Sequence, residues 1–378
     1  MLALTRFGRM GASSRLRFLQ FIDAMQVAEP SRFTFTVSPF LGDDDLRELY
    51  ETGRRNKLRL LMRYLRRAAV LTNALRYDVI WLEKEIFPGL PAMAERVLKL
   101  LGCPIVVDYD DGNFVWYTSN SSPLVRRFLR HKIEAVCDSA RRIVVANPNL
   151  RRRLTGLAGG DPLMVPTPVD LARYTTVRPT FDPGRLAIGW IGSPTTAKSL
   201  RCYEPALAAI SRLPGASFVS IGAGSAAPGF AHRALPWSEA LETQELPTWS
   251  VAVAPIEQCE FAHYKSGYKI LQCMASGLPV IASPVGVAND IITHRETGFL
   301  ASSAGECHEL LLELRSDPQL CARVGAAARA RVAERYSLEG WRAAIADTLS
   351  DAARANRQGA RRTARSGSDR VASWAARR

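Results

Sequence analysis

Short apolar runs rich in β-branched residues recur along this chain, with stretches of helical character between them. The runs lie at residues 79–82, 105–107, 143–145, 186–191, 218–221, 251–254 and 280–281. Strands that are buried on both faces and alternate with helices are typical of parallel sheets with helical crossovers. The pattern therefore predicts an α/β fold.

Length and one proline-rich segment divide the chain into two halves. The 378 residues exceed one typical domain and are sufficient for two hydrophobic cores. Residues 165–186 are dense in proline and lack a helical period, so we predict the linker there. The opening residues MLALT are predicted to form the first strand, because their apolar run is too short for a signal peptide.

Cysteine usage and hydropathy exclude two further classes of protein. The seven cysteines are scattered and form no CxxC pair, which favours the reducing cytoplasm and argues against a structural zinc. No apolar run approaches the roughly 18 residues that a membrane-spanning helix needs. We therefore expect a cytoplasmic protein without a transmembrane helix or a bound metal.

The formal net charge of +14 predicts a polyanionic partner. Eight arginines and one aspartate lie between Ala352 and Arg378, in a segment that is predicted to be a disordered tail. Nucleic acid is disfavoured as the partner, because the basic residues lack interleaved aromatic side chains and no standard nucleic-acid-binding motif is present. Phosphorylated small molecules and anionic membrane surfaces remain as candidates.

A second basic stretch reads RRNKLRLLMRYLRR at residues 54–67 and has helical periodicity. Its apolar residues Leu58, Leu61, Met62 and Leu65 fall on one stripe. Two interpretations stay open: the stripe packs on a core, as in an ordinary surface helix, or the helix lies on anionic lipid.

Loops that directly follow strands are the candidate binding sites, because ligands bind beyond the carboxyl ends of the strands in open α/β sheets. The loop after the first strand contains Gly8, Gly11, Ser13 and Ser14. Glycine amides followed by a helix start favour an anion, and a plain tight turn is the alternative.

Three carboxylates, Asp108, Asp110 and Asp111, follow the run at 105–107. At the end of a strand they could ligate a divalent metal or bind sugar hydroxyls. Helix capping and loop solvation are the alternative.

The loop after residue 191 reads GSPTTAK. The residues Gly192, Ser193, Thr195 and Thr196 offer hydroxyls and free amides, and Lys198 adds a positive charge. This combination suits an oxygen-rich anion such as a diphosphate, and a surface turn is the alternative.

The loop after residue 254 leads into a predicted helix over 268–275, which Gly277 ends and Pro279 follows. On that helix, residues three or four apart share a face, so the polar side chains near its start converge with its free amides on one anion. The residues concerned are Lys265, Ser266, Gly267, Lys269 and Gln272.

These motifs resemble the retaining glycosyltransferases of the GT-B fold, specifically family 4, the glycosyl transferases group 1, which uses nucleotide-diphosphate sugars. The segment MASGLPV at Met274–Val280 is similar to the family's Met-Ala-x-Gly-x-Pro-Val. Lys198 falls on the lysine of the family's Gly-Arg-Leu-x-x-x-Lys-Gly signature. The resemblance covers most of the chain, from the first strand to about Leu349.

Three positions depart from the family pattern. The arginine of the signature is replaced by Ser193, and two family glutamates fall on Tyr264 and Gln272. A subset of the family instead carries lysines in this loop, in a pattern that Lys265 and Lys269 fit, and that subset also resembles the GWIGSP, DYDD and SPVG motifs of this chain. The resemblance implies that these lysines supply positive charge to the donor diphosphate.

The fold implied by the resemblance has two Rossmann-like domains facing across a cleft, with a C-terminal helix that crosses back to the first domain. We expect residues 1–175 to form the acceptor domain and residues 176–337 to form the nucleotide-sugar donor domain. The crossover helix is expected at 338–352, and the basic tail at 353–378.

The activity implied is retaining transfer of a hexosyl group from a nucleotide-diphosphate sugar to a saccharide or lipid-linked acceptor, in cell-surface polysaccharide or glycolipid synthesis. Lys198, Lys265 and Lys269 would stabilise the departing diphosphate, and Asp110 and Asp111 would orient the acceptor or donor sugar. These five form the expected catalytic set. Gln272 would bind the ribose of the donor. The other loop residues expected to bind the donor are Gly11, Ser13, Gly192, Ser193, Thr195, Thr196, Ser266 and Gly267.

GT-B enzymes generally need no bound metal, so neither a metal nor a cofactor is expected besides the donor substrate. The basic stretch at 54–67 and the tail would hold such an enzyme at an anionic inner membrane face. A degenerate, non-catalytic glycosyltransferase-like binding protein is the alternative, because the residues at 193, 264 and 272 depart from the family pattern.

Overall fold

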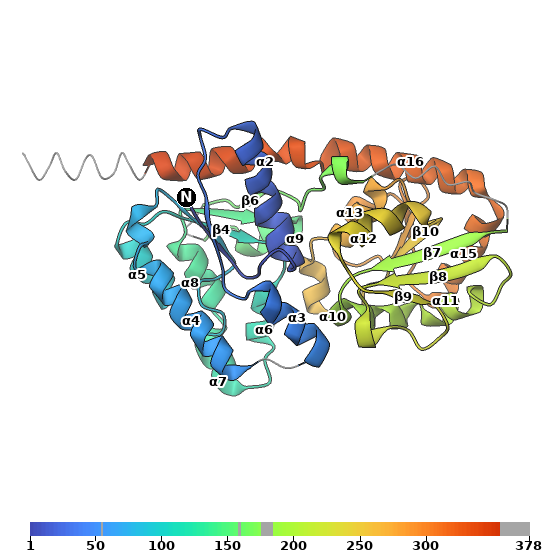
Figure 1. The fold of residues 1–378 in the computed structure, drawn as a ribbon, viewed down its shortest axis with the longest axis horizontal. Coiled ribbons are helices and arrows are strands. Elements are labelled where there is room, and N and C mark those ends of the chain that lie inside the picture. Colours follow the sequence, from blue (N-terminus) through green and yellow to red (C-terminus); the bar gives the residue numbers. More distant parts are fainter. Residues whose placement is uncertain (54–55, 158–159, 175–183, 356–378) are drawn as a thin grey trace, which may run out of the picture. The chain divides into compact units, whose positions relative to one another are not determined.

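The computed structural model describes residues 1–53, 56–157, 160–174 and 184–355, and the chain divides into two compact units. The first unit consists of Met1–Val165 together with the chain from Arg342, and the second is Pro166–Trp341. Each unit contains one six-stranded sheet in which all strands are parallel, with helices between the strands (Figure 1). The α/β prediction is thereby confirmed.

In the first unit the strand order is β2-β1-β3-β4-β5-β6. The strands are β1 (Leu2–Thr5), β2 (Thr36–Pro39), β3 (Ile80–Glu83), β4 (Ile105–Tyr109), β5 (Arg142–Val145) and β6 (Leu163–Met164). The helices are α1 (Ala12–Ser14), α2 (Gln20–Ala28), α3 (Asp43–Thr52), α4 (Lys57–Leu71), α5 (Met93–Leu100), α6 (Asn113–Thr118), α7 (Pro123–Leu129), α8 (Lys132–Ser139) and α9 (Pro148–Leu154). A π-helical turn, Arg15–Leu19, joins α1 to α2.

In the second unit the strand order is β12-β11-β10-β7-β8-β9. The strands are β7 (Leu186–Ile191), β8 (Ala216–Ile221), β9 (Arg233–Leu235), β10 (Val251–Ala254), β11 (Val280–Ala282) and β12 (Phe299–Leu300). The helices are α10 (Pro194–Ala197), α11 (Glu204–Ile210), α12 (Glu239–Glu245), α13 (Tyr268–Ala275), α14 (Ala288–Ile291), α15 (Ala304–Ser316) and α16 (Pro318–Arg335).

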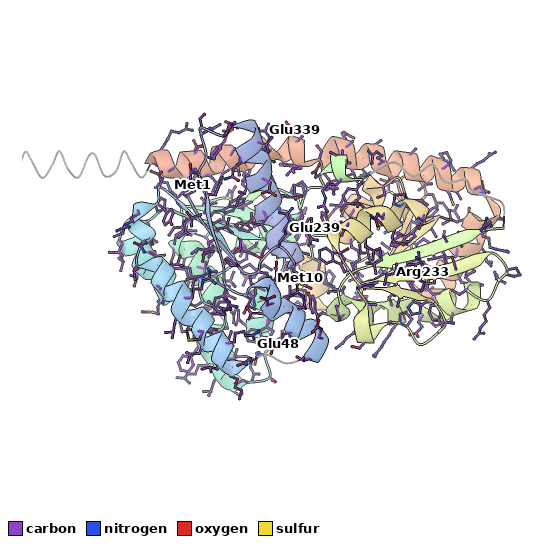
Figure 2. All side chains as sticks on the ribbon, in the orientation of Figure 1. Met1, Met10, Glu48, Arg233, Glu239 and Glu339 are labelled. Carbon is purple, nitrogen blue, oxygen red and sulfur yellow. The ribbon has the colours of Figure 1, made fainter. Side chains whose placement is uncertain are left out.

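Both faces of the second sheet are covered, which explains why its central strands β7 and β10 are apolar. Successive strand residues enter different cores: Ala252 packs in a cluster with residues of α13 and α16, whereas Val251 and Val253 pack with residues of α11 and α15. Successive side chains of a strand point to opposite faces, so α13 and the later part of α16 cover one face, and α11, α15 and the start of α16 cover the other. Side chains fill the space between helices and sheet in each unit (Figure 2).

The proline-rich segment is only in part a linker. The first unit ends at Val165, earlier than the predicted boundary at residue 175, because the next residues pack into the second unit. The Val169 amide donates to the carbonyl of Tyr336 at 2.7 Å, and Val169 and Tyr174 are both buried in the core of that unit. Residues 175–183 lie outside the described part of the chain.

The C-terminal helix spans residues 338–355, and from Arg342 it belongs to the first unit, as expected of a crossover helix. Ion pairs hold it there: Arg342 contacts Glu29 at 3.4 Å, and Asp347 contacts Arg32 at 3.2 Å. The helix continues past the predicted start of the tail at residue 353, since Ala352 and Ala353 are buried. The rest of the predicted tail, residues 356–378, lies outside the described residues.

One of the two interpretations of the basic stretch at 54–67 is wrong. The stripe formed by Leu58, Leu61, Met62 and Leu65 does not pack on a core, because each of these side chains on α4 is exposed. None of the described helices is both long and apolar enough to cross a membrane.

Candidate functional site

The strand order of the second unit marks a binding position. Counting from β7, the order runs one way through β8 and β9 and the other way through β10, β11 and β12. In doubly wound sheets, ligands bind at the carboxyl ends of the two strands where the order reverses. The loops after β7 and β10 both start at this point, and they contain the predicted diphosphate-binding residues.

Lys269 lies in the first turn of α13 and connects the two loops. Its Nζ donates a hydrogen bond to Oγ1 of Thr196 on α10 at 3.1 Å, and it lies 4.5 Å from the centroid of the Trp190 ring. Burial, with a smaller contribution from the charge of Lys265, lowers the pKa of Lys269 to about 7. Neither lysine forms an ion pair with a carboxylate of the described chain.

An ammonium without a carboxylate partner is costly to bury, and here other positive groups surround it. Lys265 lies over the Phe261 ring, with its Nζ 5.8 Å from the ring centroid. In the first turn of α13, the amides of Ile270 and Leu271 donate to the Gly267 carbonyl at 2.9 and 3.3 Å, and the helix dipole adds partial positive charge at this end. The combination is suited to a ligand that carries several negative charges.

Local packing requires the two glycines of these loops. Gly267 is the N-cap of α13 with φ of 70°, in the left-handed region, and a Cβ there would lie 2.6 Å from Cδ1 of Ile291. A Cβ on Gly192 would lie 2.6 Å from Oγ1 of Thr196 and equally close to the Trp190 ring. Glycine therefore lets each backbone pass close to its neighbours.

Of the remaining predicted residues in the loops after β7 and β10, some are buried or hydrogen-bonded and others are exposed. Ser193 caps α10, and its amide donates to Oγ1 of Thr196 at 3.0 Å. Gln272 is 5% exposed on α13, one turn after Lys269, and Ser266 is half-buried. Thr195 and Lys198 are exposed, and the structure shows no contact that brings Lys198 to Lys265 or Lys269.

A buried polar network that the sequence analysis did not identify positions the start of α13. Glu242 is 1% exposed and accepts hydrogen bonds from the Tyr174 hydroxyl at 2.6 Å and from Nε1 of Trp237 at 3.0 Å. The Tyr174 hydroxyl also lies 3.2 Å from the hydroxyl of Tyr268, the first residue of α13. Tyr174 is far in sequence from both Glu242 and Tyr268, and no local pattern indicates these contacts.

A second polar site lies in the first unit, where the strand order reverses between β1 and β3. The predicted loop residue Ser13 donates from its hydroxyl to Oδ2 of Asp110 at 2.6 Å, so the loops after β1 and β4 are in contact. Gly11 is the buried N-cap residue of α1, and its amide donates to the carbonyl of Gly8 at 3.2 Å.

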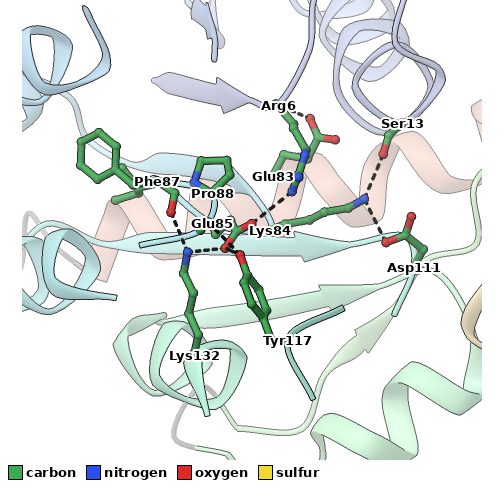
Figure 3. Close-up of polar contacts among 12 residues, drawn as sticks. Arg6, Ser13, Glu83, Lys84, Glu85, Phe87, Pro88, Asp111, Tyr117 and Lys132 are labelled. Atoms are coloured by element: carbon green, nitrogen blue, oxygen red, sulfur yellow. Dashed lines mark hydrogen bonds and ion pairs between the residues drawn. The ribbon is translucent and has the colours of Figure 1, made fainter. Parts of the chain in front are cut away.

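Lys84, which the sequence analysis missed, lies at the centre of this site (Figure 3). Its Nζ lies 2.7 Å from Oδ1 of Asp110 and 3.0 Å from Oδ1 of Asp111. Burial alone would lower the pKa of Lys84, but the two carboxylates outweigh burial and raise it. Burial alone would also raise the pKa of Asp110, yet Lys84 lowers it, whereas burial keeps the pKa of Asp111 raised.

The acidic neighbours of Lys84 are also buried and hydrogen-bonded. Oε2 of Glu83 accepts from the Ser14 hydroxyl at 2.6 Å, while its Oε1 has no partner among the described residues, and burial raises the pKa of Glu83. Glu85 contacts Arg6 at 3.1 Å and also pairs with Lys132 (Figure 3). Three consecutive charged residues directly after an apolar strand were the available signal for this cluster.

Asp108 has a structural role rather than the binding role considered from the sequence. It is buried on β4, and Arg17 donates to it from Nε at 2.9 Å and from Nη2 at 3.0 Å. Within the described ranges, no group of three or more histidine, cysteine or acidic side chains is arranged to hold a metal ion. Of the three aspartates in this loop, Asp110 and Asp111 remain partly exposed, with 12% and 25% of their side-chain surfaces accessible to solvent.

Comparison with known proteins supports the sequence motifs. Residues 186–317, the larger part of the second unit, match the family described as glycosyl transferases group 1. No curated protein sequence matches the chain.

Three solved structures are similar in fold. HepE from Anabaena, in complex with UDP-glucose, is 17% identical with a TM-score of 0.65, covering 93% of this chain and 99% of that chain. Sucrose-phosphate synthase from Thermosynechococcus elongatus is 15% identical with a TM-score of 0.63, covering 93% and 98%. WaaG, a glycosyltransferase involved in lipopolysaccharide biosynthesis, is 14% identical with a TM-score of 0.65, covering 92% and 99%. The predicted fold class, GT-B with two Rossmann-like domains, is confirmed.

Proposed function

We propose that the protein is a glycosyltransferase that transfers a hexosyl group from a nucleotide-diphosphate sugar to a saccharide or lipid-linked acceptor, with retention of configuration. Its second unit binds the donor, and its first unit binds the acceptor. The product belongs to a cell-surface polysaccharide or glycolipid. The match of residues 186–317 to glycosyl transferases group 1 supports the reaction class.

The observation that carries this proposal is the position of Lys269. Its ammonium lies at the start of α13, contacts Thr196 of the neighbouring loop at 3.1 Å, and has no carboxylate partner in the described chain. A diphosphate bound there would receive the charges of Lys269 and Lys265 and the amides of α13. Because negative charge grows on the diphosphate as the sugar leaves, these groups stabilise the transition state more than the ground state.

The first unit contributes the acceptor-binding groups in this proposal. Asp110 and Asp111 accept hydrogen bonds from sugar hydroxyls, and Lys84 holds both carboxylates in place at 2.7 and 3.0 Å. Carboxylates fixed by a buried cation need little reorganisation when a polyol binds.

The test is a thermal-shift screen of the full chain against nucleotide-diphosphate sugars, followed by a hydrolysis and transfer assay with the donor that binds. A ligand that binds only the folded state stabilises it by about 2.7 kcal/mol at one hundred times its Kd. One donor should raise Tm and be hydrolysed slowly without acceptor. A chain that binds donors but never turns them over would be the non-catalytic alternative, and one that binds none contradicts the proposal.

The pH dependence of donor binding follows from Lys269. Its pKa is lowered to about 7, so its positive charge is present well below pH 7 and is lost as the pH rises through 7. We expect the Kd of a nucleotide-diphosphate sugar to increase between about pH 6 and pH 9, by up to about tenfold per pH unit above the pKa. Such a donor has no diphosphate ionisation in this range, whereas free UDP would titrate itself.

Calorimetry in buffers of different ionisation enthalpy measures this effect directly. Binding near pH 8 should take up a proton in the wild type and none in Lys269→Met. A Kd that is independent of pH in the wild type would show that Lys269 does not bind the diphosphate.

A further inference from the structure

The helix α4 (Lys57–Leu71) has two arginine side chains toward the protein, which is unusual for a surface helix. Arg67 is 2% exposed, and its Nη2 donates to the carbonyls of Thr5 at 2.7 Å and Ser38 at 3.0 Å. Arg63 lies 2.9 Å from Asp45. Surface helices ordinarily bury their apolar stripe, and here arginines occupy the buried face.

The opposite face of α4 is apolar and exposed. Leu58 is 70% exposed, Leu61 54%, Met62 56% and Leu65 55%. Their spacing of three and four residues places them on one continuous stripe of the helix. Single exposed leucines are common, but a continuous exposed stripe indicates an interaction surface.

Cations flank this stripe on both sides. At about 100° per residue, Arg59 and Arg66 lie on one side of it and Lys57 on the other. Arg59 pairs with Glu48 of α3 at 2.6 Å, whereas Lys57 and Arg66 are exposed and form no ion pair with a described residue. An apolar stripe bordered by lysine and arginine is the pattern of helices that lie in a membrane interface.

A second helix of the same unit repeats the pattern. On α7 (Pro123–Leu129), Leu124 is 67% exposed and Phe128, one turn later, is 66% exposed. Exposed Arg126, Arg127 and Arg130 accompany them. Both helices are labelled in Figure 1.

We propose that the exposed face of α4 docks on an anionic lipid surface, with the leucine stripe entering the headgroup region and the flanking cations contacting lipid phosphates. The positive charge of this face favours anionic lipid over a second copy of the chain as the binding partner. The protein has a net charge of +14, and the stripe is bordered by cations, so two copies of this face repel each other while anionic lipid attracts it. The proposal does not depend on the proposed transfer reaction.

The test is flotation of the full chain with vesicles of phosphatidylcholine alone and of phosphatidylcholine with phosphatidylglycerol. The wild type should bind the anionic vesicles, and added salt should weaken that binding. The variant Leu61→Asp with Met62→Asp should bind at least tenfold more weakly. The matched control is Val27→Asp on α2, where the side chain is 84% exposed away from this stripe, and it should bind like the wild type.

Four readouts keep the outcomes distinct. Tm of each variant should be unchanged, because the replaced side chains are exposed, and donor binding should be unchanged, because it belongs to the second unit. Vesicle binding that is the same in the double variant as in the wild type would assign the binding to the arginines after residue 355 and overturn the proposal. A wild-type dimer that the double variant dissociates, seen by light scattering, would also overturn it.

Discussion

Replacing Lys269 with methionine is expected to weaken binding of a nucleotide-diphosphate sugar by at least about a hundredfold and to make the free protein more stable. Methionine keeps an unbranched apolar side chain beside Trp190, which Lys269 now covers at 4.5 Å. It removes the ammonium that we assign to the diphosphate, and losing one charged partner of a desolvated pair costs roughly 2–5 kcal/mol.

The expected gain in stability comes from removing a charge that is costly to bury in the free protein. The pKa of Lys269 is about 7 in the folded protein and 10.5 in the unfolded reference. Below pH 7 both states carry the charge, so the cost of burying it is fully present there. Between pH 7 and 10.5 the folded protein loses the proton first, and that cost declines. Lys269→Met should therefore raise Tm by a few degrees at pH 6 and by less at pH 9.

Calorimetric unfolding and donor titration on the same samples measure both effects. The matched control is Arg212→Met, an exposed cation of the same unit, which should change neither quantity appreciably. A variant that is both less stable and weaker in binding would mean that Lys269 is a structural residue, because loss of structure alone would then explain the loss of binding. Gain of stability with loss of binding is the signature of a residue kept for function.

Replacing Lys84 with methionine is expected to lower the free energy of unfolding by about 3–5 kcal/mol, the usual cost of removing one partner of a buried ion pair. Lys84 lies between the carboxylates of Asp110 and Asp111, at 2.7 and 3.0 Å. Its removal leaves both carboxylates, together with buried Glu83, without the nearest cation. Methionine has similar volume, so the loss would not come from a cavity.

Urea denaturation near neutral pH measures this loss. The control Lys99→Met removes an exposed lysine of the same unit and should stay within about 0.5 kcal/mol. Adding Asp110→Asn to Lys84→Met should recover part of the stability, because one uncompensated charge is gone. If Lys84→Met lost less than about 1 kcal/mol, the ion pairs would have to be weakly coupled to folding.

Lys84 has a second feature that its sequence position did not reveal. Its φ is 64°, in the left-handed region, which costs a residue with a side chain roughly 1–2 kcal/mol. The strain is retained together with hydrogen bonds from the Lys84 amide to the carbonyl of Asp108 at 3.0 Å and from the Tyr109 hydroxyl to the Lys84 carbonyl at 2.8 Å. Strained positions concentrate at functional sites, which agrees with a role in acceptor binding.

The sequence by itself determined the elements that depend on local pattern. The first strand, the apolar strands and the helix Tyr268–Ala275 all lie where periodicity and turn residues indicated. Gly277, with φ of 77°, follows that helix. These features follow from backbone preference and burial of successive side chains, which a sequence shows directly. Parallel strands with glycine-containing loops also indicated which loops hold the candidate binding residues.

Only the tertiary structure decided which side chains meet. The contact of Lys269 with Thr196 joins residues 73 positions apart, and the Glu83–Lys84–Glu85 cluster depends on loops from three strands. The exposure of the α4 stripe was likewise undetermined, because an amphipathic helix can turn either face inward. Arg67 and Arg63 fix that choice by bonding inside the unit. Periodicity states which residues share a face, and only packing states what that face contacts.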